Sequence, residues 1–329
     1  MKAIIVADDE SRALAWREVP TPEVGPDGVL VEVHATAVNR ADLLQRRGLY
    51  PPPPGESQIL GLEAAGVVAE TGRDVTVWQT GDRVLCLLGG GGYAEYVAVH
   101  SDMVLPIPAG LDFEQAAAIP EAFYTAFVNL TFEAGLAVGE SVLIHAGGSG
   151  VGTAAIQIAR RTGARVFVTA GSDDKIRRCT ELGAHEAVNY KTEDFKERLT
   201  ALTGRRGADV VLDCVGGSYL DKHVGLLRTR GRLVLIGLMG GNKAEIDLAA
   251  VVRKRLRVIG SVLRSRTLAE KIAITRAFAT DVLPLFESGA LKPVIDSTYA
   301  IADAERAHEH VAANKNFGKV ILRVATDGP

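Results

Sequence analysis

The chain has 329 residues, of which 47% are apolar and 23% charged, and its formal net charge is −3. At about 100–200 residues per domain, this length predicts two domains. A mildly acidic chain with 5% aromatic residues and no block of like charge is not typical of proteins that bind nucleic acid or a membrane surface.

The cysteines and the apolar segments exclude disulfide-stapled, membrane-spanning and secreted proteins. Cys86, Cys179 and Cys214 form no C-x-x-C pair, which excludes a disulfide framework and a four-cysteine zinc site. No stretch approaches the roughly 20 apolar residues of a membrane span, and the first apolar run is too short for a signal peptide. We therefore expect a soluble protein of the cytoplasm.

The chain up to about Pro120 contains short β-like runs separated by turn residues. The clearest runs are residues 2–6, 28–34, 64–70, 82–87 and 94–99. Several short strands at this spacing predict a compact, barrel-like β domain.

From about Glu121 the pattern changes to alternating strands and helices. Strands are predicted at 141–146, 165–170, 187–189, 209–215, 232–238 and 256–262, and helices at 152–161, 173–182, 194–202 and 220–227. This alternation predicts a parallel sheet with helices on both faces. A long helix at 267–288 is expected to lead back to the first domain, so the predicted domains are 1–120 with 275–329, and 121–274.

A glycine-rich turn follows the first strand of the second domain. It reads Gly147-Gly148-Ser149-Gly150-Val151-Gly152 and opens a helix. Glycine permits a tight turn and close approach to a pyrophosphate, and the helix amides then face the anion. Ser149 replaces the middle glycine of G-x-G-x-x-G, and a purely structural turn is the alternative. The place of the glycine-rich turn at the start of the alternating strands and helices favours a dinucleotide site.

The end of the second strand bears on which nicotinamide is bound. NAD sites place an acid there to bind the ribose 2′-hydroxyl. Here the residues are Thr169-Ala170-Gly171-Ser172, with Lys175 one turn into the following helix. A missing carboxylate together with a cation favours a 2′-phosphate, and so NADP. Asp173 and Asp174 leave NAD open, although acids also suit a helix N-terminus.

Ten segments together resemble the medium-chain dehydrogenase/reductase superfamily, over nearly the whole chain. The general landmarks are residues 61–68 (GLEAAGVV), 81–84 (GDRV) and 92–96 (GYAEY). Seven further segments resemble its zinc-free quinone oxidoreductases, in particular the p53-inducible type: 119–122 (IPEA), 169–172 (TAGS), 189–191 (NYK), 213–219 (DCVGGSY), 237–241 (GLMGG), 263–266 (LRSR) and 313–319 (ANKNFGK).

That resemblance implies a Rossmann doubly wound parallel sheet plus a GroES-like, β-barrel-type catalytic domain. It also implies a homodimer that binds NADPH in the cleft between its domains and reduces quinones or related electron-poor carbonyl compounds. The implied cofactor-binding residues, counting Gly147 of the turn, are Asn39, Gly147, Ser149, Gly150, Val151, Gly171, Ser172, Lys175, Tyr190, Gly237, Leu238, Leu263, Arg264, Asn316, Phe317 and Lys319. Asn39 and Tyr50 match positions that face the nicotinamide and the substrate.

The sequence predicts no catalytic zinc. Zinc-dependent relatives have a cysteine ligand where this chain has Asn39, and Gly-His-Glu where it has Gly61-Leu62-Glu63. Leu62 cannot ligate a metal, and an amide is a poor zinc ligand. The seven histidines show no zinc-binding spacing. Without a Lewis acid to stabilise an alkoxide, the acceptor is expected to be electron-poor already.

The predicted chemistry is hydride transfer from NADPH to a quinone. Asn39 would orient the nicotinamide or donate to the developing oxyanion, and Tyr50 would bind a substrate oxygen or supply a proton. Alternatively, Tyr50 packs on the proline loop after it and Asn39 satisfies loop backbone. Two other functions remain open: an enone or alkenal reductase using the same site, and a largely non-catalytic NADPH-binding protein.

Overall fold

The computed structural model describes residues 1–324 and divides the chain into two compact units. Unit 1 comprises residues 1–124 with the chain from 263 onward, and unit 2 comprises residues 125–262. The predicted domain boundary at 274/275 differs, because the helix that follows residue 262 belongs to unit 1. No helix within the described part of the chain is long and apolar enough to cross a membrane.

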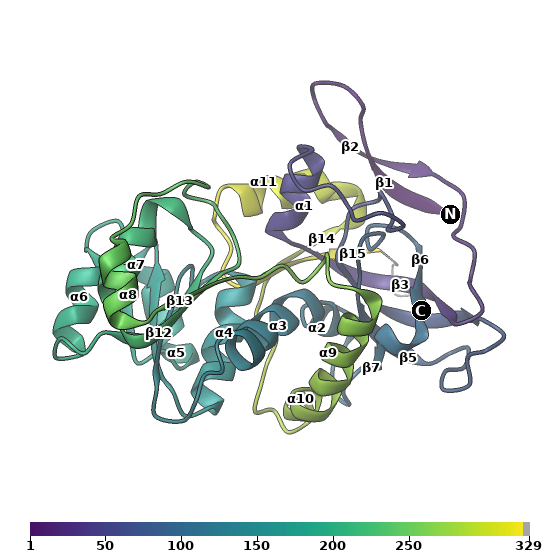
Figure 1. Cartoon of the computed structure of the whole chain (residues 1–329). Helices are drawn as coiled ribbons and strands as arrows, with labels where there is room; N and C mark the ends of the chain where they lie inside the picture. The colour runs from purple at the N-terminus through teal and green to yellow at the C-terminus, as the bar shows by residue number, and fades with distance from the viewer. Residues whose placement is uncertain (325–329) are drawn as a thin grey trace. The chain divides into compact units, whose positions relative to one another are not determined.

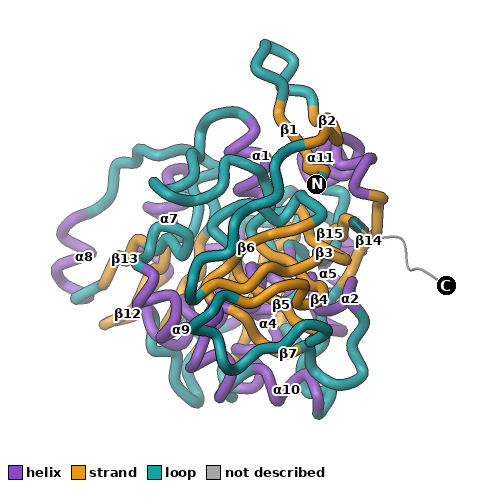
Figure 2. The backbone as a smooth tube through the Cα atoms, turned by 90° about the vertical axis from the view of Figure 1, so that its right-hand side faces the viewer, coloured by secondary structure: helices purple, strands orange, loops and turns teal. Residues whose placement is uncertain are grey.

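Unit 1 is mainly β-structure (Figure 2). Its strands are β1 (Lys2–Val6), β2 (Leu14–Glu18), β3 (Gly28–Val38), β4 (Glu63–Thr71), β5 (Arg83–Leu87), β6 (Tyr96–His100), β7 (Val104–Pro106), β14 (Ile295–Ala300) and β15 (Lys319–Arg323). Seven of these form one sheet, in the order β14-β15-β3-β4-β5-β7 with β6 pairing β3, while β1 and β2 form a separate antiparallel ribbon. The prediction of a β-rich first domain is confirmed, and β2, β7, β14 and β15 lie outside the clearest predicted runs.

The helices of unit 1 differ from the prediction at one point. They are α1 (Arg40–Arg46), α2 (Phe113–Ala117), α9 (Leu268–Asp281), α10 (Leu283–Glu287) and α11 (Ala304–Ala312), while α3 (Pro120–Phe127) spans the boundary between the units. The single helix predicted at 267–288 is wrong, because it divides at Val282 into α9 and α10. Pro284 lacks the amide hydrogen that a continuous helix needs, so a new helix starts there.

Unit 2 is a six-stranded parallel sheet with the order β10-β9-β8-β11-β12-β13 (Figure 1). The strands are β8 (Ser141–Ile144), β9 (Arg165–Ala170), β10 (Glu186–Asn189), β11 (Ala208–Asp213), β12 (Leu227–Leu235) and β13 (Arg257–Gly260). The helices are α4 (Gly150–Arg161), α5 (Asp173–Leu182), α6 (Phe195–Leu202), α7 (Leu220–Leu226) and α8 (Leu248–Lys254). Numbered within the unit, this is the 3-2-1-4-5-6 order of a Rossmann fold, so the predicted doubly wound sheet is confirmed.

The core of unit 2 explains why its strands are continuous apolar runs. Leu143, Phe167, Val211 and Leu233 come from four adjacent strands and are fully buried in one cluster. Strands covered on both faces need apolar side chains at every position rather than at alternate ones. Because β12 ends at Leu235, the residues that follow lie in a loop beyond the sheet, not in the strand predicted at 232–238.

Candidate functional site

The glycine-rich turn joins β8 to α4, as the sequence predicted. Ser149 caps the helix, since its hydroxyl accepts from the Gly152 amide at 2.9 Å. The Ser149 amide donates to the Ala146 carbonyl at 2.8 Å. Within residues 1–324, the amides of Gly150 and Val151 donate to no protein acceptor. These two open amides at a helix N-terminus fit the phosphates of a dinucleotide.

Close packing explains why two positions of this turn are glycine. A Cβ at Gly152 would lie 2.3 Å from the Ala146 carbonyl oxygen. A Cβ at Gly147 would lie 3.0 Å from the Cys179 sulfur. A side chain at Gly152 would therefore push the turn away from the helix and displace the open amides.

The end of β9 gathers four residues predicted to surround a 2′-phosphate. Ser172 caps α5, and its hydroxyl accepts from the Lys175 amide at 3.4 Å. A Cβ at Gly171 would lie only 2.7 Å from the Tyr190 hydroxyl oxygen, so Gly171 and Tyr190 are direct neighbours. Tyr190 is 43% exposed and its ring is therefore accessible to a ligand.

The two acids that left NAD open are both engaged within the protein. The Asn189 amide donates to Asp173 Oδ1 at 2.8 Å. Asp174 pairs with the Arg177 guanidinium at 2.5 Å. A ribose hydroxyl would have to compete with these partners, which favours a helix-terminal role for both acids.

Two loops after β11 and β12 lie at the same end of the parallel sheet as the turn. A Cβ at Gly216 would lie 2.8 Å from Leu238 Cδ2, and one at Gly237 would lie 3.0 Å from the Cys214 carbonyl oxygen. Leu238 is 54% exposed. The carboxyl ends of parallel strands are where such folds bind ligands, which fits the predicted role of Gly237 and Leu238.

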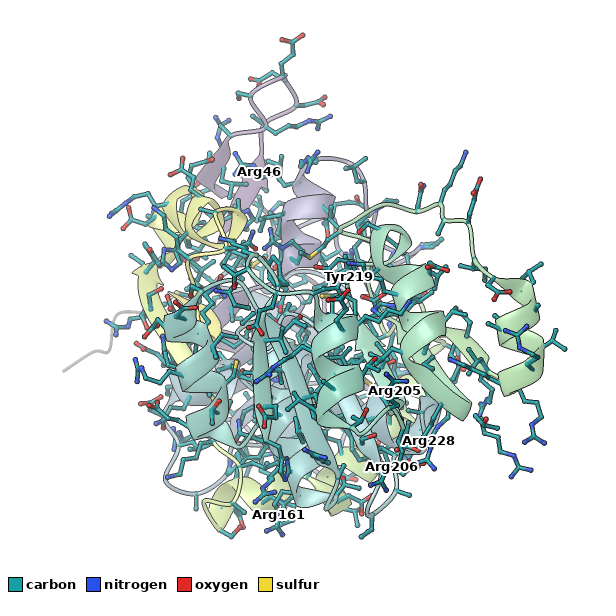
Figure 3. All side chains as sticks on the ribbon, turned by 90° about the vertical axis from the view of Figure 1, so that its left-hand side faces the viewer. Arg46, Arg161, Arg205, Arg206, Tyr219 and Arg228 are labelled. Carbon is teal, nitrogen blue, oxygen red and sulfur yellow. The ribbon has the colours of Figure 1, made fainter. Side chains whose placement is uncertain are left out.

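Four arginines of unit 2 lie toward the opposite end of its sheet. Arg161 ends α4, Arg205 and Arg206 follow α6, and Arg228 lies near the start of β12. In Figure 3 all four are labelled below Tyr219, which lies toward the other end of the unit. The positive charges of these arginines are therefore separate from the predicted phosphate site.

In unit 1, Asn39, Glu63 and Lys319 form a buried polar cluster. The Lys319 ammonium donates to Glu63 Oε1 and to Asn39 Oδ1, both at 2.6 Å, and the Asn39 amide donates to Glu63 Oε1 at 2.7 Å. Strand register assembles the cluster, since β4 and β15 both begin where β3 ends. The second amide hydrogen of Asn39 is directed at the Ala37 carbonyl at 3.3 Å. For Asn39 to donate to an acceptor, one of these bonds would have to break.

A second series of buried hydrogen bonds continues from this cluster. The Asn39 backbone amide donates to Asp42 Oδ2 at 2.7 Å, and the Tyr93 hydroxyl donates to the same oxygen at 3.3 Å. The Tyr93 hydroxyl also lies 3.1 Å from His308 Nε2. Burial raises the pKa of Asp42 to about 6 and lowers the pKa of His308 to about 4. His308 is therefore uncharged at neutral pH.

Arg264 links Tyr50 to α1 and to the loop that follows β5. Its guanidinium donates to the Gly89 carbonyl at 2.6 Å, to Gln45 Oε1 at 2.8 Å and to the Tyr50 carbonyl at 3.3 Å, and it lies 5.2 Å from the centre of the Tyr50 ring. The Tyr50 hydroxyl has no hydrogen-bond partner within residues 1–324. Burial raises the pKa of Tyr50, and the carboxylate of Glu121 adds to this rise.

Glu121 is a site residue that the sequence reading missed. It follows Pro120 at the start of α3, and its backbone amide donates to Glu63 Oε2 at 2.8 Å. Its side chain lines a pocket of unit 1 together with Gly89, Leu263 and Arg264. Burial, and the negative charge of Glu63, raise the pKa of Glu121 to about 8. The sequence offered two signals: the family-like segment 119–122, which assigned Glu121 no role, and an acid at a helix N-terminus, which has an ordinary explanation.

The remaining predicted residues lie around the turn before β15. The Phe317 amide donates to Asp296 Oδ1 at 2.8 Å, and its ring is buried. The Asn316 amide donates to the Gly318 carbonyl at 2.8 Å. Within unit 1 the structure thus joins Asn39 to Lys319 and Tyr50 to Arg264, while Asn316 bonds to Gly318 and the Phe317 backbone to Asp296.

The residues at the zinc position of related enzymes do not fit a zinc ion. Leu62 is 2% exposed and offers no ligand atom. The oxygen of Asn39 and Oε1 of Glu63 both accept from the Lys319 ammonium, whose positive charge would repel a metal cation. That the chain uses no zinc remains a prediction.

One group of potential metal ligands does occur within residues 1–324, in unit 2: His145, Asp213 and His223. The Nε2 atoms of the two histidines lie 2.8 Å apart, and His145 Nδ1 lies 2.8 Å from Thr169 Oγ1. Burial lowers the pKa of His223 to about 3 and that of His145 well below its usual range. A hydrogen bond between two uncharged imidazoles accounts for this geometry without a metal.

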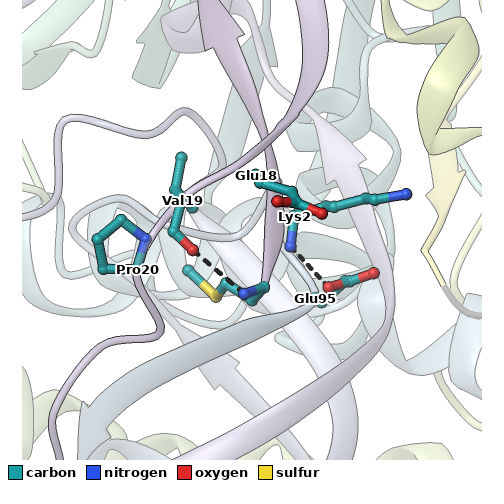
Figure 4. Close-up of a pocket in the computed structure, with 6 residues that line it drawn as sticks. Lys2, Glu18, Val19, Pro20 and Glu95 are labelled. Atoms are coloured by element: carbon teal, nitrogen blue, oxygen red, sulfur yellow. Dashed lines mark hydrogen bonds between the residues drawn. The ribbon is translucent and has the colours of Figure 1, made fainter.

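A surface pocket near the N-terminus lies apart from all the predicted site residues. It is lined by residues that include Lys2, Glu18 and Glu95, and the Lys2 amide donates to Glu95 Oε2 at 2.6 Å (Figure 4). It contains no unpartnered catalytic group, so we assign it no function.

Known families match both units. The profile described as alcohol dehydrogenase GroES-like domain matches residues 25–109, and the profile described as zinc-binding dehydrogenase matches residues 150–279. The quinone oxidoreductase of Rattus norvegicus is 34% identical over 306 residues, which cover 92% of this chain and 91% of the relative.

Solved structures agree over nearly the whole chain. An NAD-dependent alcohol dehydrogenase is 34% identical with a TM-score of 0.88, covering 99% of this chain and 100% of that one. Escherichia coli quinone oxidoreductase complexed with NADPH is 30% identical with a TM-score of 0.87, covering 98% and 99%. The CurK enoyl reductase is 27% identical with a TM-score of 0.87, covering 98% and 99%. The chain therefore belongs to the quinone oxidoreductase family of the medium-chain dehydrogenase/reductases.

Proposed function

We propose that this protein is a zinc-independent NADPH:quinone oxidoreductase that transfers a hydride or electrons from NADPH to a quinone. One observation supports the proposal most: the Lys319 ammonium donates to Asn39 Oδ1 and to Glu63 Oε1, so both oxygens are already bonded to a cation. With no Lewis acid to stabilise an alkoxide, the site suits an acceptor that is already electron-poor.

The proposed cofactor is NADP. The open amides of Gly150 and Val151 would bind its pyrophosphate, and Ser172, Lys175 and Tyr190 its 2′-phosphate. When bound, the reduced nicotinamide supplies the hydride. The engaged carboxylates of Asp173 and Asp174 support NADP over NAD, and the NADPH complex of the Escherichia coli relative is in line with this choice. The chain is also similar to an NAD-dependent alcohol dehydrogenase, so the test of this preference for NADP compares NADPH with NADH.

The residues of unit 1 have separate proposed roles toward the acceptor. Asn39 holds the Lys319 ammonium in place, which makes it a positioning residue whose amide is already bonded. The Tyr50 hydroxyl, which lacks a partner in the described chain, would bind an oxygen of the acceptor. Arg264 holds the backbone of Tyr50 and therefore its orientation.

Two alternatives differ in the acceptor or in the reaction. Similarity to an enoyl reductase favours an enone or alkenal as substrate, because a conjugated enone accepts a hydride much as a quinone does. The other alternative is a protein that binds NADPH with little turnover. From the family resemblance we also propose that the protein is a cytoplasmic homodimer that acts on a small molecule.

The test is the rate of NADPH oxidation by 1,4-benzoquinone and by methyl vinyl ketone, compared with NADH and repeated after treatment with a chelator. We expect turnover that is fastest with NADPH and the quinone and that the chelator leaves unchanged. Faster turnover of the enone would favour the reductase alternative. Tight NADPH binding without turnover of either acceptor would reject the proposed reaction and leave the cofactor assignment intact.

A further inference from the structure

Glu121 has no assigned function, and its side chain lacks a partner. Within residues 1–324 its carboxyl oxygens accept no hydrogen bond and form no ion pair. Every other acid of the site is bonded: Glu63 to Lys319, and Asp42 to the amides of Asn39 and Gly61. A partly buried carboxyl without a partner is uncommon, because burial disfavours its charged form.

The position of Glu121 is determined by the cluster that we place at the reaction site. Its backbone amide is bonded to Glu63, the acid that holds Lys319, and its side chain lines the pocket that Arg264 also lines. Tyr50 is close enough for the charge of Glu121 to affect its titration. The carboxyl of Glu121 is therefore near Tyr50, the residue proposed to bind the acceptor, yet it is bonded neither to Tyr50 nor to Arg264.

Reduction of a quinone or an enone needs a proton as well as a hydride. Hydride addition places a negative charge on the acceptor oxygen, and a group that delivers a proton there lowers the barrier. Tyr50 was the sequence candidate, but its pKa is raised above its usual value near 10, which makes it a weak acid at neutral pH. A carboxyl whose pKa is about 8 is better matched to this task.

We propose that Glu121 is the proton donor to the acceptor oxygen, an inference that rests on the proposed reductase function. In this step the acceptor gains the electron pair and hydrogen of the hydride, and its oxygen becomes negative. The O–H bond of Glu121 then breaks, its proton bonds to that oxygen, and the electron pair stays on the carboxylate. Water reprotonates Glu121, whose side chain is only half-buried.

The groups around Glu121 come from several elements. Glu63 on β4 and Asp42 on α1 disfavour its carboxylate, whereas Lys319 on β15 and Arg264 favour it. The protonated form therefore prevails at neutral pH and is lost above about pH 8. Turnover that depends on this proton should decline in the same range.

The test uses the full chain with NADPH and 1,4-benzoquinone, and compares Glu121→Gln with the wild type. Glutamine keeps the size and the helix of the native residue but has no acidic proton. We expect kcat to fall about 10²-fold near pH 7, with the alkaline decline and the solvent deuterium isotope effect both abolished. Glu121→Asp should recover part of the rate, and formate should partly rescue Glu121→Ala. The control Glu95→Gln, in the surface pocket near the N-terminus, should behave as the wild type.

A readout without turnover separates this inference from the proposed function. The infrared difference between wild type and Glu121→Gln, recorded without cofactor, should contain a protonated carboxyl band that disappears above about pH 8. If the wild type reduces quinone and Glu121→Gln matches its rate and pH profile, Glu121 is not the proton donor. If the wild type reduces neither acceptor, the reductase function fails and this inference with it, whatever the infrared band shows. An active wild type without that band would also overturn the inference.

Discussion

Both units bury a network of polar side chains, but the two networks differ in charge. In unit 1, Glu63 and Lys319 form a buried ion pair beside the pocket that Glu121 lines. In unit 2, His145 and His223 are uncharged imidazoles enclosed beneath the glycine-rich turn. Unit 2 also buries the Asp213 carboxylate, but its oxygens accept from the backbone amides of Val215 and Gly216. Burying an ion pair is costly, so the Glu63–Lys319 pair of unit 1 indicates where chemistry rather than shape is required. The neutral network supports the turn, whereas the charged one surrounds the groups proposed to act on the acceptor.

Breaking the ion pair between Glu63 and Lys319 should have the largest effect on the free energy of unfolding. Lys319→Met leaves the Glu63 carboxylate buried without a cation, and we expect the free energy of unfolding to fall by about 3–5 kcal/mol. Urea unfolding measures this loss. The exposed Lys315→Met is the matched control and should change stability by less than about 0.5 kcal/mol. Adding Glu63→Gln to Lys319→Met should recover much of the loss, and a loss no larger than the control's would mean that Lys319 does not stabilise Glu63.

Breaking the neutral network of unit 2 should cost less. His145→Leu removes the bonds to Thr169 and His223, and we expect unfolding to become easier by about 1–3 kcal/mol. A double-mutant cycle with His223→Leu tests the coupling, because the double variant should cost less than both single variants together. Strictly additive losses would show that the two imidazoles do not interact.

The half-buried Lys175 of unit 2 can be tested by its effect on cofactor choice. Lys175→Ala should weaken NADPH binding about 10-fold, the equivalent of one charge-assisted hydrogen bond, and leave NADH binding unchanged. Fluorescence titration with both cofactors measures the difference. Arg206→Ala removes an equal charge at the far end of the same sheet and should alter neither affinity. Equal weakening of both cofactors would exclude a contact to the 2′-phosphate.

The smallest effect concerns the pH dependence of stability, on which Glu121 of unit 1 and the two buried histidines of unit 2 act in opposite directions. The pKa of Glu121 is raised from 4.5 to about 8, so between these values the folded state holds a proton that the unfolded state releases. Its contribution to the free energy of unfolding therefore decreases as pH rises through that range. The lowered pKa values of His145 and His223 instead remove stability as pH falls below about 6.5.

Unfolding of the wild type and Glu121→Gln across this pH range tests the first of these effects. The difference between their stabilities should shift against the wild type as pH rises, by a modest amount because water partly reaches Glu121. A difference that is constant with pH would contradict the raised pKa.

Local patterns predicted much of unit 2. The helix at 173–182 and the strand at 165–170 have the predicted bounds, because caps and apolar runs act over a few residues. The helix at 267–288 was wrong where Pro284 outweighed the apolar pattern around it. Glu121 was missed because its role depends on Glu63, an acid 58 residues earlier in the chain.

The glycine-rich turn and the lack of zinc ligands at Asn39 and Leu62 could be predicted from the sequence, because residue type and local backbone decide both. No local pattern could show that Asn39 and Lys319, 280 residues apart, are hydrogen-bonded to each other and that both are bonded to Glu63. The physical reason is register: β3, β4 and β15 must pair at one particular alignment before their ends meet. A slip of one residue would turn these side chains to the other face of the sheet.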